Sequence, residues 1–113
     1  MQNQTAMNYV EKFSDAELVQ SIEEGLIYMC ACPAQVADAL RKLRELYRYQ
    51  MACLEDSANA SVVHQTICNS VIISHAELQD CMARVLELEQ WDRTTLRMPE
   101  GLRRRQLQEM QGD

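Results

Sequence analysis

The 65 residues between Pro33 and Pro99 contain neither glycine nor proline. Strands must be joined by tight turns, and tight turns depend on these two residue types. A stretch of this length without either is typical of long helices that break once at most. We therefore expect an all-α fold, an antiparallel bundle of three main helices with a long third helix and a short C-terminal helix or tail.

The chain of 113 residues has the size of one domain. We expect a single helical bundle over residues 1–113, with a flexible N-terminus at 1–13 and a basic tail at 93–113. No apolar run reaches the roughly 18 residues of a membrane span, and the N-terminus lacks the pattern of a secretory signal. We therefore expect no membrane partner.

Two local signals mark where the first two helices begin. Ser14 and Glu17 have the spacing of a capping box, and Phe13 and Leu18 are placed as a hydrophobic staple around it. Pro33 suits the first turn of the second helix, because an N–H at that position would have no partner within the helix.

The third helix is expected over residues 59–92. Its apolar residues recur every three or four positions, as in a coiled coil. We assign the core of the bundle to one such seam: Ile67, Val71, Leu78, Val85 and Leu88. The β-branched residues between 62 and 73 also permit strands, but the seam runs through them without a change of phase. Residues 59–76 carry no charge, so this helix is expected to be covered on more than one side.

Helix length suggests a partner. At 1.5 Å per residue the third helix measures about 50 Å and overhangs the second by about 13 Å. We expect a second copy to cover the overhang in a homo-oligomer, most simply a two-fold dimer. The alternative is a monomer whose own termini cover it. The predicted interface is a second apolar strip: Cys68, Ile72, Met82, Leu86 and Trp91.

The five cysteines and the missing signal favour a cytoplasmic protein with free thiols. A thiol-redox or metal-binding protein is the main alternative function. The hairpin model offers two ligand sets: Cys30, Cys32 and Cys81 at one end, and Cys53, His64 and Cys68 at the other. Because no CxxC spacing occurs, we expect packing cysteines and no metal or cofactor. His64 and His75 are expected to be core or interface histidines with hydrogen-bond partners.

No catalytic motif accompanies these residues. Neighbouring carboxylates fall on different helix faces, and nucleophile-elbow, phosphate-loop, zinc-protease and dinucleotide patterns are missing, so we expect no enzyme and no catalytic residue. The net charge of -6 disfavours nucleic acid; only the Arg103–Arg105 run suggests a nucleic-acid-binding regulator. The predicted function is protein–protein interaction through helix faces, as a small adaptor, chaperone-like subunit or regulator.

Overall fold

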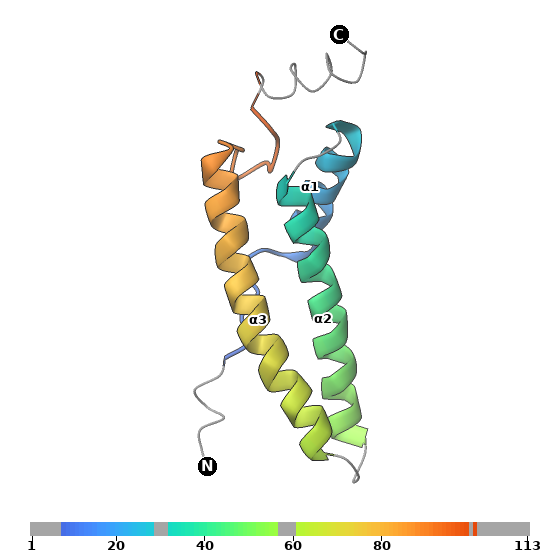
Figure 1. The fold of residues 1–113 in the computed structure, drawn as a ribbon. Helices are drawn as coiled ribbons and strands as arrows, with labels where there is room; N and C mark the ends of the chain where they lie inside the picture. Colours follow the sequence, from blue (N-terminus) through green and yellow to red (C-terminus); the bar gives the residue numbers. More distant parts are fainter. Residues whose placement is uncertain (1–7, 29–31, 57–60, 100, 102–113) are drawn as a thin grey trace.

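The fold is all-α in the part of the chain that the computed structural model describes, which comprises residues 8–28, 32–56, 61–99 and 101. Three helices follow one another: α1 (Asp15–Tyr28), α2 (Cys32–Asp56) and α3 (Ser61–Leu88). The chain rises through α1, returns through α2 and rises again through α3 (Figure 1). The expected all-α fold with three main helices is confirmed. Of the expected C-terminal helix or tail at 93–113, the structure describes residues 93–99, which are not helical, and Gly101.

The capping box at the start of α1 is present as predicted. The backbone N–H of Ser14 donates to the Glu17 carboxylate at 2.8 Å, and the N–H of Glu17 donates to the Ser14 hydroxyl at 3.0 Å. Phe13 and Leu18, the two residues of the staple, are both buried in the main hydrophobic cluster. Together these contacts set the angle at which the chain enters α1.

The α2–α3 hairpin is the long axis of the molecule. The β-branched residues near the start of α3 are helical, because the apolar repeat of three and four positions prevails over strand propensity. Helix α3 ends at Leu88, four residues before the predicted end at 92. None of the helices in the described ranges is both long and apolar enough to cross a membrane.

A Schellman motif ends α3. The N–H of Trp91 donates to the carbonyl of Leu86 at 2.9 Å, and the N–H of Gln90 donates to that of Glu87 at 3.1 Å. Gln90 has a positive φ of 61°, the left-handed conformation in which this motif normally uses glycine. The motif turns the chain sharply, and Trp91 packs back into the cluster that contains Leu86.

The segment after α3 folds over the end of the bundle. Asp92 holds its first turn, because its side chain accepts hydrogen bonds from the N–H groups of Thr94 and Thr95 at 2.8 and 2.9 Å. Leu96 and Met98 are buried, and the N–H of Met98 donates to the Glu24 carboxylate at 2.9 Å. The chain's own C-terminal segment therefore covers Leu86 and Trp91 of the overhang, as in the alternative to a second subunit, whereas Leu88 stays 82% exposed.

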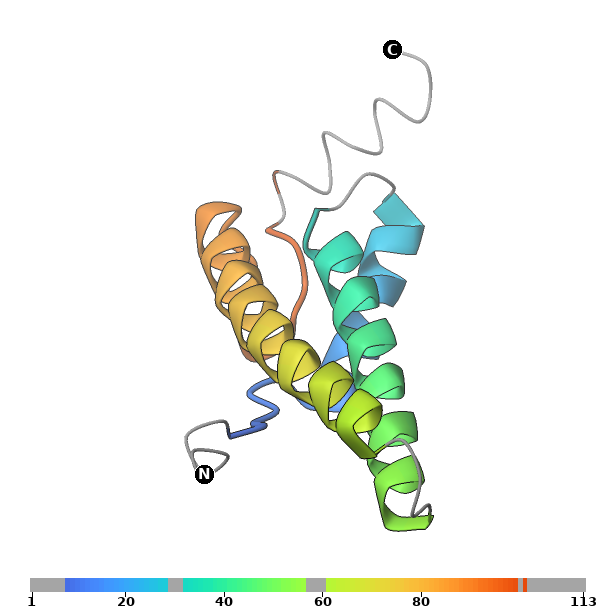
Figure 2. The same ribbon diagram turned by 60° about the horizontal axis from the view of Figure 1, so that its bottom comes forward.

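The main hydrophobic cluster of the described residues lies at the end of the hairpin that carries α1. Its buried members are Phe13, Leu18, Ala37, Leu40, Met82, Leu86, Trp91, Leu96 and Met98. Beyond this cluster α2 and α3 continue as a pair of helices (Figures 1 and 2). The molecule is correspondingly long, with extents of 59 × 22 × 18 Å and a radius of gyration of 17.4 Å, against about 13 Å for a compact chain of this size.

The left-handed conformation of Gln90 at the end of α3 predicts a stabilising substitution. A side chain in this conformation costs about 1 kcal/mol, so Gln90→Gly should raise the free energy of unfolding by up to about 1 kcal/mol, measured by urea denaturation. Ala83→Gly is the control, because glycine inside a helix lowers stability by a similar amount. A loss of stability in both variants would contradict the proposed cap.

Candidate functional site

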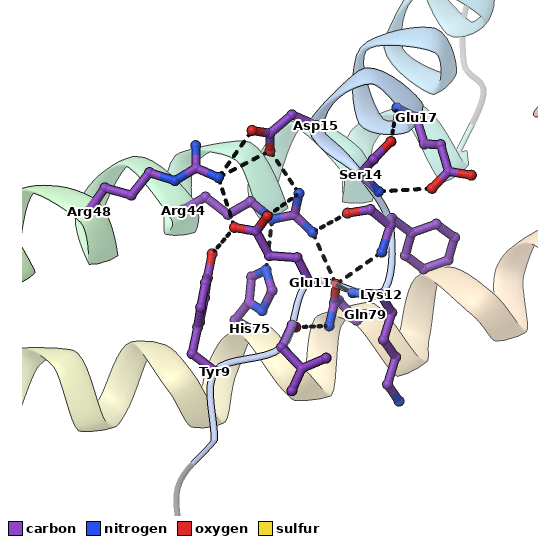
Figure 3. Close-up of polar contacts among 12 residues, drawn as sticks. Tyr9, Glu11, Lys12, Ser14, Asp15, Glu17, Arg44, Arg48, His75 and Gln79 are labelled. Atoms are coloured by element: carbon purple, nitrogen blue, oxygen red, sulfur yellow. Dashed lines mark hydrogen bonds and ion pairs between the residues drawn. The ribbon is translucent and has the colours of Figure 1, made fainter.

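A buried arginine organises the middle of the hairpin. The side chain of Arg44 on α2 is only 1% exposed. Its guanidinium donates to Asp15 Oδ1 at 2.8 Å, to the carbonyl of Phe13 at 2.7 Å, to Gln79 Oε1 at 3.0 Å and to His75 Nε2 at 2.9 Å (Figure 3). One side chain thus joins α1, the segment before it and α3.

Gln79 of α3 fixes the N-terminal segment on the same side of the hairpin. Its Oε1 also accepts from the backbone N–H groups of Lys12 and Phe13 at 2.8 and 3.4 Å, and its Nε2 donates to the carbonyl of Val10 at 2.9 Å. The sequence predicted a flexible terminus over residues 1–13. The described part of it instead makes these backbone hydrogen bonds, because the amide of Gln79 offers both a donor and an acceptor.

His75 is neutral in this network. Its Nε2 accepts the Arg44 Nε–H, so that nitrogen carries no proton. Burial, reinforced by the positive charge of Arg44, lowers the pKa of His75 from 6.5 to about 4. The ring of Tyr9 stacks on Tyr47 with centroids 3.8 Å apart and lies 4.9 Å from the His75 ring. The expected hydrogen-bonded histidines are confirmed: half-buried His64 Nδ1 lies 2.6 Å from Gln50 Oε1.

The network also has an exposed rim of charge. Arg48, one turn beyond Arg44, bonds Glu11 at 2.8 Å and Asp15 at 3.0 Å. Hydrogen bonding to Arg44 lowers the pKa of the Asp15 carboxyl. Glu11 and Asp15 therefore both meet arginines on one side of α2.

The opposite side of the hairpin remains open. Both ribbon views place α1 and the N-terminal segment behind the α2–α3 pair, which faces the viewer (Figures 1 and 2). A helix turns about 100° per residue, so Leu43 and Leu46 leave α2 on the side away from Arg48. We call this side the open face: Val36, Ala39, Leu43 and Leu46 of α2, and Val63, Ile67, Ser70, Ser74, Leu78, Cys81, Val85 and Leu88 of α3.

The open face is apolar and carries no charge. All its residues are exposed or half-buried, and Leu88 is 82% exposed. On both helices they recur at steps of three and four, the spacing of a packing seam. Surface helices normally carry charge on the side that meets water. A face of this kind, extending along the hairpin, is the candidate interaction site.

The predicted interface strip is wrong in its exposure. Cys68, Met82, Leu86 and Trp91 are buried inside the single chain, and Ile72 is half-buried. The predicted core seam is less buried than expected: Val71 is buried, Ile67, Leu78 and Val85 are half-buried, and Leu88 is exposed. Of these, Leu78 packs against the core cluster. The adjoining strip of α3 is the more deeply buried of the two. The cause is that the true seam contains His75 and Gln79, polar residues that the apolar pattern passes over.

The apolar pattern of the sequence did not identify Arg44 as a buried residue. A signal for its burial exists, because Ala37, Leu40 and Arg44 follow one another at steps of three and four. Such spacing continues the buried seam of α2. The need for polar partners on α3 could not be read from this spacing alone.

The cysteines do not come together as a metal site in the described part of the chain. Neither Cys53, His64 and Cys68 nor any other group of three suitable side chains there has metal-binding geometry. Cys68 is buried, and burial raises the pKa of its thiol. Cys32 is exposed at the start of α2 and Cys81 is half-buried on α3. Cys30 and Arg103–Arg105, named in the alternative functions, lie outside the described residues.

Comparison with known proteins adds no assignment. No family model matches the chain, no curated protein matches its sequence, and no solved structure matches its fold.

Removing the buried arginine should cost far more stability than removing its exposed neighbour. Arg44→Met removes the hydrogen bonds to His75, Gln79 and the carbonyl of Phe13 together, and we expect a loss of about 3–5 kcal/mol in the free energy of unfolding. Arg48→Met is the control: it loses ion pairs to Asp15 and Glu11, but its side chain is 50% exposed, and we expect about 1 kcal/mol or less. Urea denaturation measures both. Equal losses would show that Arg44 is not the buried centre of the network.

The low pKa of His75 predicts acid sensitivity in a defined window. Between pH 6.5 and 4 the unfolded chain binds a proton that the folded chain excludes. Stability should therefore be fully present above pH 6.5 and fall by about 3 kcal/mol in total as the pH drops to 4.

Urea denaturation across this pH range measures the slope. In His75→Gln, where an amide oxygen can accept the Arg44 hydrogen bond, the slope should be smaller. An identical slope in the variant would contradict a neutral, buried His75.

Proposed function

We propose that this protein is a small helical interaction module that binds another protein chain through the open face. The observation that carries the proposal is the absence of charge along this apolar face of a two-helix hairpin, while its other side is covered by α1 and the N-terminal segment. Apolar helix faces are recognised by packing a further helix or hairpin into their seams. The role requires no catalytic residue. Self-association, which the sequence also predicts, is one form of it.

The exposure of apolar side chains on the open face supports a binding role for it. A charged outer side keeps a helix hydrated, and α3 has such a side beyond residue 76, where Glu77 and Arg84 form an exposed ion pair at 3.7 Å. The open face instead leaves Leu46, Val63 and Leu88 in contact with water. Burying such side chains against a partner is favourable, at about 25 cal/mol per Å² of apolar surface.

Two exposed leucines on opposite sides of the molecule test the role. Leu88→Glu places a charge on the open face, and Leu26→Glu places one on α1; the native side chains are 82% and 75% exposed, so neither change disturbs the core. Each tagged variant is mixed with lysate of the producing cells, and the retained chains, copies of this protein included, are quantified. Binding should be lost in Leu88→Glu and kept in Leu26→Glu. Loss in Leu26→Glu alone would refute the open face as the site.

A further inference from the structure

The open face has the dimensions of a small dimer interface. Its α3 residues, Val63 to Leu88, extend over about 38 Å, and its α2 residues, Val36 to Leu46, extend over about 15 Å. At about 10 Å of width per helix the flat footprint is roughly 530 Å², the size of a small interface. An interface of standard size buries about 800 Å² on each partner. One partner of similar size and shape, such as another two-helix hairpin, would cover this face.

The charge of the chain and of the open face bears on which partner can bind there. In a two-fold interface each face meets its own copy, so any charge near the axis meets a like charge. This chain has a net charge of -6, which opposes self-association through a charged surface. The residues of the open face carry no charge of their own, and Glu77 at its edge is the charge of α3 nearest the axis. The open face also offers no ion pair that would select an acidic or basic partner.

Resting on the proposed function, we infer that the partner of the open face is a second copy of this chain. In this dimer α3 packs antiparallel against α3 of the second copy, and α2 packs antiparallel against α2 of the second copy. The two hairpins then form a four-helix bundle. The two-fold axis passes between the two copies of α3, at the level midway between Ser74 and Leu78.

The residue pattern of α3 is nearly symmetric about this axis. With antiparallel helices, Val63 lies opposite Leu88 of the second copy, and Ile67 lies opposite Val85. Each pair is at the same distance along the helix from the axis to within about one residue, or about 1.5 Å. Four apolar side chains thus meet apolar side chains.

Nearer the axis, small residues meet larger ones. Ser70 lies opposite Cys81 of the second copy, and Ser74 lies opposite Leu78. Small side chains allow two helices to approach closely, and large ones fill the space between them, so alternation across facing positions gives close packing. The two serines that interrupt the apolar seam of the open face are therefore compatible with close packing of the two helices.

The uneven charge of α3 fits the same arrangement. Residues 61–76 of α3 carry no charge, whereas Glu77, Asp80 and Arg84 follow on its outer side. An antiparallel pair sets the charged half of each helix beside the uncharged half of the other. A parallel pair would set Glu77 beside Glu77 and Arg84 beside Arg84. In the antiparallel pair the two Arg84 side chains lie about 24 Å apart along the helix, whereas each Glu77 is one residue from the two-fold axis and remains near its own copy.

Two neighbouring valines supply a matched test. Val63 (56% exposed) lies on the open face, and Val62 (76% exposed) points to another side of α3. Light scattering of the full chain should give twice 13.0 kDa. Val63→Glu should raise the dissociation constant of the dimer at least about 100-fold, because each dimer buries two added carboxylates. Val62→Glu should leave it unchanged.

Cross-linking tests the register independently of these variants. Ser70→Cys should form a disulfide with Cys81 of the second copy on mild oxidation, giving a covalent dimer on a non-reducing gel. The dimer should disappear when Cys81→Ser is added. Asn69→Cys, one position round the helix, should give none. Circular dichroism verifies that each variant is folded.

The outcomes separate the dimer from the wider role. A 13.0 kDa species at 100 µM, about the concentration of a weak complex, overturns the dimer. If a different protein is then bound by the native chain and lost in Leu88→Glu, the proposed function stands without the dimer. A dimer that Val62→Glu dissociates as readily as Val63→Glu, or one without the Ser70→Cys cross-link, overturns the assigned face and register.

Discussion

The guanidinium of Arg44 must have all its partners in place at once. A charge removed from water is costly unless hydrogen bonds and an opposite charge replace its hydration. Asp15 supplies the charge, and Phe13, His75 and Gln79 supply the acceptors. Because these groups belong to α1, the segment before it and α3, the arginine on α2 can be buried only when the three are assembled around it.

This requirement gives the hairpin two different sides. The groups that satisfy Arg44 and Gln79 lie on one side of α2 and α3, and they bring α1 and the N-terminal segment with them (Figure 3). The C-terminal segment caps the same end of the molecule through Leu96 and Met98. No described segment remains to cover the other side. The charge-free seams of the open face are therefore exposed on the single chain, and the proposed interaction follows from that exposure.

The sequence pattern was most reliable where a few neighbouring residues determine the structure. The Ser14–Glu17 box, the helical nature of the stretch after Pro33 and the hydrogen-bonded histidines were all predictable, because each depends on local spacing or on residue chemistry. The pattern failed over which strip of α3 is buried. Counting apolar residues favoured the Ile67–Leu88 seam, whereas the structure buries the neighbouring seam through His75 and Gln79. Polar residues enter a core only with partners, and the partner is distant in sequence.

The sequence by itself determined three helices, their caps and a face without charge, since helical periodicity and capping act over a few residues. Only the tertiary structure decided which side of the hairpin that face lies on. Arg44 and Gln79 are 35 positions apart, and a hydrogen bond over that separation exists only once α2 has turned back on α3. The partners of the buried Arg44 determine which side of the hairpin is covered, and the opposite side is therefore left exposed.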